Sequence, residues 1–228
     1  MICSVSTESS LAGTTRSVPE VRAEYILLGS GCPELQRLRG YIVEAYRRHR
    51  GTHPVIHELE GIAQITEVVR GETRRTSVLM IAHGSEQGIV QRGSPLPDEA
   101  EYLTAAWWKD CEMIGMLYLL GCFTTHAIGI YKLTQVCDGA VGYGNLTVFY
   151  DGHPVGKSVS TRLVNDIIGS WATQDTADGL YVAVLGQYDA TLRWMHGRRW
   201  FLQSCVREVK RFMQLLIGLQ MDGLKRAP

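Results

Sequence analysis

Two almost wholly apolar runs constrain the fold of this chain more than any other feature. The first covers residues 77–82 and is followed by His83-Gly84; the second covers residues 113–120 and is followed by Gly121-Cys122. Runs of this length without polar alternation are typical of parallel strands that are covered on both faces. We therefore expect both runs to be strands in the interior of one sheet.

Helical and strand-like segments alternate around these two runs. Strands are expected at 25–29, 54–59 and 140–143, a loop at 85–97, and helices at 33–49, 62–70, 98–110, 127–136, 157–171, 178–195 and 201–219. Such alternation indicates parallel strands joined by right-handed crossovers. The pattern predicts an α/β fold with a mainly parallel sheet and extra helices towards the C-terminus.

Length and composition narrow the class of protein. The 228 residues fit one domain of ordinary size, and we expect a flexible, Ser/Thr-rich segment at residues 1–20 before a single domain at 21–228. Lys+Arg and Asp+Glu number 23 each, so the formal net charge is zero and does not favour binding to nucleic acid or to an anionic membrane. Without an apolar stretch of about 18 residues or an export signal, the expected location is the cytoplasm.

The six cysteines are widely spaced and include no C-x-x-C pair. A disulfide framework or a structural zinc site is therefore not expected, and each cysteine is either a small buried hydrophobe or a reactive thiol. The context of Cys122, directly after an apolar strand and before a predicted helix, favours a reactive thiol.

His83 and Cys122 follow two strands of the predicted sheet, and parallel sheets place reactive groups at the carboxyl ends of their strands. If the two strands are neighbours, about 4.8 Å apart, an imidazole and a thiol meet at that edge. His83 would then act as the base and Cys122 as the nucleophile, activated further by the following helix. The N–H groups of Gly84 and Cys122 would form an oxyanion hole. Taken singly, a histidine or a cysteine is more often structural; the pair, each flanked by glycine, favours catalysis.

An apolar block ending in His-Gly, followed by a second ending in Gly-Cys, resembles the caspase-like clan of cysteine peptidases, which includes metacaspases and separases. The segment from about residue 20 to 151 is most similar to bacterial CHAT-type domains, with Ala140–Gly144 matching their strand after the cysteine. The resemblance implies a sheet with helices on both faces, a His83/Cys122 dyad, a Gly84 oxyanion donor and a protein or peptide substrate. It also implies an activating partner protein and a role in bacterial defence or programmed death.

The resemblance has departures. The pentapeptide Gln-Ala-Cys-x-Gly of caspases is absent, because this chain has Leu-Gly-Cys-Phe-Thr at 120–124, so specificity for aspartate is not supported. Asp151 occupies the stretch where related proteins place an acid that faces a basic substrate side chain, which makes it a candidate specificity residue. As a residue before Gly152, it also fits a simple turn.

Other functions stay open at this point. The domain could be a catalytically silent binding or regulatory module, or a thiol amidohydrolase acting on a small amide. The glycines at 29 and 31 lack the third glycine of a dinucleotide loop, and Cys122 with His126 lacks a second ligand pair for zinc. The basic and aromatic segment 193–200 favours a helix end and a turn over nucleic-acid binding. No cofactor, calcium or other metal is expected.

Overall fold

The computed structural model describes residues 23–72, 75–93, 100–111, 113–145, 147, 152–197 and 204–227. The predicted flexible segment at 1–20 and the candidate specificity residue Asp151 lie outside these ranges.

A six-stranded sheet forms the centre of the molecule, in the order β2-β1-β3-β7-β8-β9. Its strands are β1 (Ala23–Leu28), β2 (Ile56–Glu58), β3 (Thr76–Ile81), β7 (Ile114–Leu120), β8 (Ala140–Tyr143) and β9 (Leu224–Ala227). Within this sheet, β1 pairs in parallel with β2 and β3, and β7 pairs in parallel with β3 and β8. The last strand, β9, runs antiparallel beside β8. The predicted mainly parallel sheet is confirmed, and β9 is an addition that the sequence pattern did not indicate.

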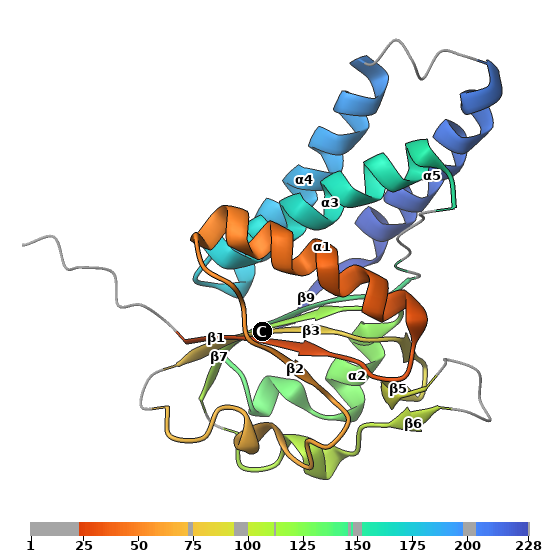
Figure 1. Ribbon diagram of the computed structural model, residues 1–228. Coiled ribbons are helices and arrows are strands. Elements are labelled where there is room, and N and C mark those ends of the chain that lie inside the picture. The colour runs from red at the N-terminus through yellow and green to blue at the C-terminus, as the bar shows by residue number, and fades with distance from the viewer. Residues whose placement is uncertain are drawn as a thin grey trace, which may run out of the picture.

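Helices cover both faces of the sheet, as predicted (Figure 1). They are α1 (Pro33–Arg50), α2 (Thr124–Ile130), α3 (Pro154–Thr173), α4 (Ala177–Gly197) and α5 (Ser204–Gly223). Four of them, α1, α3, α4 and α5, share one hydrophobic cluster with the sheet, whereas α2 belongs to the cluster on the opposite face. In Figure 1, α4 and α5 extend well beyond the sheet.

Two predicted helices are wrong. The segment 62–70 forms only the 3-10 turn η1 (Ile65–Glu67), and 98–110 holds the short strand β6 (Glu101–Tyr102) and the 3-10 turn η2 (Ala105–Trp108). Glycines with positive φ, Gly61 and Gly71, bracket the first segment and limit its length. These short turns pack buried side chains such as Trp108 against the face that α2 covers.

A second, three-stranded sheet has the order β4-β5-β6, and its first strand follows directly after His83. Strands β4 (Gly84–Ser85) and β5 (Gly88–Arg92) pair antiparallel. The described part of the predicted 85–97 loop is therefore a hairpin. The hairpin begins directly after His83, and the N–H of Val90 donates to the carbonyl oxygen of His83 at 2.9 Å.

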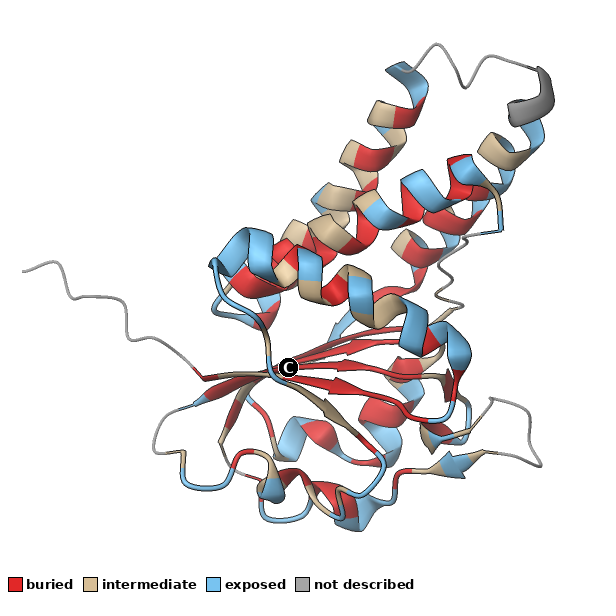
Figure 2. Ribbon diagram, in the orientation of Figure 1, coloured by how far each residue is buried: buried red, intermediate tan, exposed pale blue. Residues whose placement is uncertain are grey.

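Burial explains why the apolar runs form the inner strands. All six residues of β3 are buried, and Figure 2 shows the central strands almost entirely in the buried colour. Each aliphatic side chain buried in this way contributes about 1.5–3 kcal/mol. The two apolar runs of the sequence, which form β3 and β7, are thus at the centre of the folded protein.

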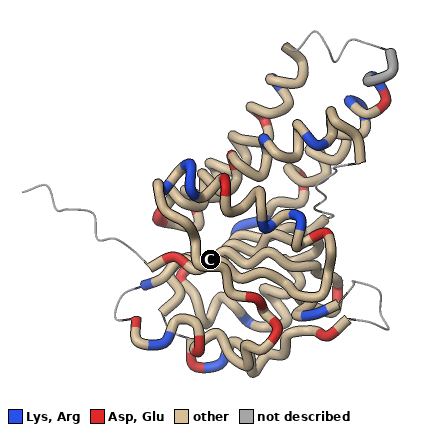
Figure 3. The backbone as a smooth tube through the Cα atoms, in the orientation of Figure 1, with Lys and Arg blue, Asp and Glu red and all other residues tan. Residues whose placement is uncertain are grey.

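Charged residues of both signs are interspersed along the chain, mostly away from the central strands (Figure 3). No helix within the described ranges combines the length and apolar character that a membrane span requires.

Candidate active site

The carboxyl ends of β3 and β7 bring His83 and Cys122 to the same edge of the sheet. The two strands are neighbours, with Ile81 and Leu120 as register partners, and the N–H of Ala82 donates to the carbonyl oxygen of Leu120 at 3.3 Å. Ile81 and Leu120 also pack into the same hydrophobic cluster. His83 and Cys122 each lie two residues further along, so the strand adjacency on which the predicted dyad depends is present.

Two glycines permit a very close approach between the loops that leave these strands. A Cβ at Gly84 would overlap the carbonyl oxygen of Cys122, and a Cβ at Gly121 would overlap that of Ala82. The His-Gly and Gly-Cys pairs seen in the sequence are therefore a packing requirement of this edge, since any larger residue would push the two loops apart.

Cys122 lies at a sharp turn between β7 and α2. The next residue, Phe123, has a left-handed backbone with φ 53°, and α2 begins at Thr124, slightly earlier than predicted. The backbone N–H of Thr147 donates to the Cys122 sulfur at 3.2 Å, and the thiol lies 3.4 Å from the carbonyl oxygen of Thr147. Burial raises the pKa of the Cys122 thiol, and the hydrogen bond with Thr147 partly offsets that effect. The thiol is therefore protonated at neutral pH.

His83 makes its side-chain hydrogen bond to a different cysteine. Its Nε2 lies 3.0 Å from the sulfur of Cys32, and within the described ranges no hydrogen bond joins it to Cys122. Burial lowers the pKa of His83, while the negative charge of Glu34 acts in the opposite direction. The imidazole is accordingly neutral at pH 7, as a general base must be.

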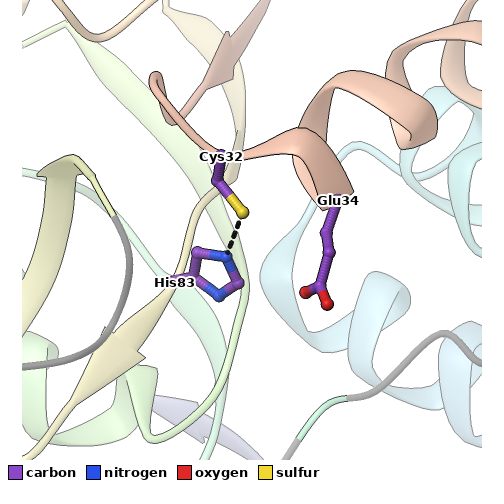
Figure 4. Close-up of side chains that lie close together, drawn as sticks. All are labelled: Cys32, Glu34 and His83. Atoms are coloured by element: carbon purple, nitrogen blue, oxygen red, sulfur yellow. Dashed lines mark hydrogen bonds between the residues drawn. The ribbon is translucent and has the colours of Figure 1, made fainter.

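Cys32 and Glu34 lie next to His83, at the start of the helix α1 that follows β1. Cys32 is the extended residue before α1, with Pro33 at the first helical position, and Glu34 lies in the first turn. Figure 4 shows the Cys32 thiol directed at the imidazole and the Glu34 carboxylate beside it. Sulfur, imidazole nitrogen and carboxylate oxygen all lie within 4.8 Å of one another.

Sequence reasoning missed Cys32 and Glu34 as site residues. The signal that could have found them is the Gly-Ser-Gly turn at 29–31, because it follows the strand that pairs directly with β3. The N–H of Gly29 donates to the carbonyl oxygen of Ile81 at 2.9 Å, which ties this turn to the end of β3. His83 is thus flanked by the β1 turn on one side and the β7 turn on the other.

Other sequence candidates do not join this site. Cys122 precedes α2 and His126 lies within it, exposed, so the two do not form a helical ligand pair. Arg193 belongs to α4, where it pairs with Asp189, and α4 ends at Gly197, as the helix-end interpretation predicted.

Comparison with protein-family models and with curated proteins finds no match for this chain. What the fold defines is an α/β protein with a mostly parallel sheet, and functional inference has to come from the residues at its carboxyl edge.

Proposed function

We propose that this protein is a cysteine endopeptidase of the caspase-like type, in which His83 is the general base and Cys122 the nucleophile. The observation that supports it is the close backbone contact that two glycines permit between the turns carrying His83 and Cys122, at the carboxyl ends of adjacent parallel strands. The exposure of Cys122 adds support, since this residue is only partly buried.

The proposed reaction begins from a neutral imidazole and a neutral thiol. His83 removes the thiol proton as the Cys122 sulfur attacks the substrate carbonyl, and it returns that proton to the leaving amine. The N–H groups of Gly84 and Cys122 would stabilise the oxyanion. Water, activated by His83, then hydrolyses the thioester and frees Cys122.

This mechanism requires the imidazole of His83 to leave its hydrogen bond with Cys32 and to form one with Cys122 when substrate binds. Catalytic hydrogen bonds are often long or misaligned without substrate and tighten in the complex. The cytoplasmic setting, a protein or peptide substrate, an activating partner and a role in bacterial defence or programmed death belong to the same proposal. So does a preference for basic side chains through Asp151.

The test is cleavage of a fluorogenic peptide library by wild type, Cys122→Ala and His83→Ala. Cys137→Ser is the matched control, because Cys137 is a buried free cysteine whose thiol donates a hydrogen bond to the carbonyl oxygen of Leu133 at 3.0 Å and has no role in the proposed mechanism. We expect wild type and the control to cut and both dyad variants to lose at least about 10³-fold in kcat/KM.

Cell lysate is added in parallel to supply an activating partner. Cleavage of small amides but of no peptide would favour the amidohydrolase alternative. No turnover under any condition, with folded protein, would contradict the proposal and favour the silent binding module.

A further inference from the structure

Cys32, Glu34 and His83 form a compact set of donor atoms that the peptidase mechanism does not use as a set. They combine one thiol sulfur, one carboxylate oxygen and one imidazole nitrogen, all within 4.8 Å of one another. Cys32 is buried, His83 is partly buried and Glu34 is exposed, so the set opens to solvent on one side. Figure 4 shows the three side chains converging from the start of α1 and the end of β3.

The distances suit a tetrahedral metal ion. Ligand atoms bound to zinc at about 2.0–2.3 Å lie roughly 3.3–3.7 Å from one another. The sulfur of Cys32 and Nε2 of His83 are 3.0 Å apart, and the largest separation in the set is 4.8 Å at most. Glu34 is exposed, so solvent and not a packed side chain surrounds it where it would turn towards the ion.

The chemistry of the donors also selects the metal. A thiolate and an imidazole favour zinc over magnesium or calcium, which prefer oxygen ligands. The thiolate and the carboxylate together balance the two positive charges of the ion, which limits the cost of placing it at a partly buried position. The Cys32 sulfur makes no capping hydrogen bond to α1, so it is not committed to the helix.

We propose that Cys32, Glu34 and His83 bind a zinc ion, with the Cys32 proton released to solvent. Three protein ligands leave a fourth position for water. Since the ion takes the Nε2 lone pair of His83, the zinc-bound protein cannot use His83 as a base. This consequence rests on the proposed function, and it makes the site a reversible, metal-dependent off switch for the same dyad.

Metal binding is tested first, in the full chain with the Cys122→Ala substitution, so that neither turnover nor the nucleophile contributes. The metal-free protein is titrated with Co²⁺, whose thiolate charge-transfer and tetrahedral visible bands report the ligands, and bound Co²⁺ is displaced with Zn²⁺. We expect one ion per chain. Adding Cys32→Ser or Glu34→Gln should weaken binding by more than the roughly 10- to 100-fold that loss of an outer-shell partner costs. Cys137→Ser is the control.

The outcomes separate this site from the peptidase proposal. Equal metal affinity of Cys122→Ala with and without Glu34→Gln would overturn the inference, and so would loss of binding on Cys122→Ala alone, which would assign the metal to Cys122. Glu34 is exposed, so the Glu34→Gln variant is expected to fold. It therefore keeps the test decisive even if the Cys32→Ser variant fails to fold. In wild type, zinc should suppress peptide cleavage and a chelator should restore it, and Glu34→Gln should require a higher zinc concentration for the same fractional loss.

Discussion

At the scale of single residues, the site depends on two glycines whose missing side chains let the β3 and β7 turns touch. A methyl group at Gly84 would overlap the carbonyl oxygen of Cys122, which is backbone and cannot rotate away. Gly40, in the middle of α1, has open space around its Cβ position and an ordinary helical backbone. The two glycines thus offer a matched pair of substitutions.

We expect Gly84→Ala to lower the free energy of unfolding by about 1–3 kcal/mol, because the two turns must separate. Gly40→Ala should instead stabilise the protein by about 0.5–1 kcal/mol through helix propensity. Urea denaturation of both variants measures the difference. A neutral effect of Gly84→Ala would contradict the close approach on which the site depends.

The protonation of Cys122 gives a second prediction at this scale. Burial raises its pKa, so the thiolate fraction is small at neutral pH and grows only as pH rises beyond the ordinary thiol value of about 8.5. Alkylation of Cys122 in the substrate-free protein should therefore accelerate continuously above that pH. Rates from mass spectrometry that are already at a plateau near pH 6 would indicate a preformed ion pair with His83, against this account.

At the scale of elements, a chain of buried tyrosine hydroxyls joins the sheet to the C-terminal helices. The hydroxyl of Tyr143 in β8 lies 2.6 Å from that of Tyr118 in β7 and 2.8 Å from that of Tyr188 in α4. Burial raises the pKa of all three far beyond neutrality, so they remain uncharged hydrogen-bonding groups. Removing the central hydroxyl leaves both neighbours short of a partner.

Tyr143→Phe should cost about 1–3 kcal/mol of unfolding free energy for that reason. Tyr181→Phe, on α4 but partly exposed and without a hydrogen bond among the described residues, should change it by less than about 0.5 kcal/mol. Thermal unfolding followed by circular dichroism compares the two. Equal effects would show that the hydroxyl chain does not stabilise the fold.

Some helices and strands could be predicted from the sequence, and others could not. Continuous apolar runs predicted β3 and β7 because burial on both faces leaves no polar positions, and a proline start with helical periodicity predicted α1. The segment that became β9 was not predicted, because a short strand with Lys225 and Arg226 exposed carries too few apolar residues to signal one.

The site could be predicted only in part. His83 and Cys122 follow buried strands, so strand-end reasoning finds them. Cys32 reaches His83 only because β1 pairs with β3, and periodicity within a segment does not encode the order of strands in a sheet. The hydrogen bond to Cys32, in place of one to Cys122, depends on side-chain packing that no sequence pattern specifies.

At the scale of the whole molecule, the two faces of the sheet are built differently. One hydrophobic cluster runs continuously from the central strands through α1 and α3 to α4 and α5, whereas the other face is covered by α2 and short 3-10 turns. Inner residues of α5 such as Ile217 belong to the first cluster, while Leu215, two positions earlier, is 68% exposed. The C-terminal helices are therefore packed as part of the same core as the sheet.

Ile217→Ala should accordingly destabilise the whole protein by about 2–5 kcal/mol in one cooperative transition, because a cavity in α5 is a cavity in the shared core. Leu215→Ala should have little effect. Denaturation followed by both circular dichroism and tryptophan fluorescence checks this. Separate transitions for the two probes would mean that α4 and α5 unfold independently of the sheet.

Covalent trapping with a peptidyl electrophile, followed by mass spectrometric mapping of the modified cysteine in metal-free protein, tests whether His83 activates Cys122. We expect a single adduct on Cys122 that is lost in His83→Ala and retained in Cys32→Ser. An adduct on Cys32, or labelling of Cys122 that does not depend on His83, would contradict it.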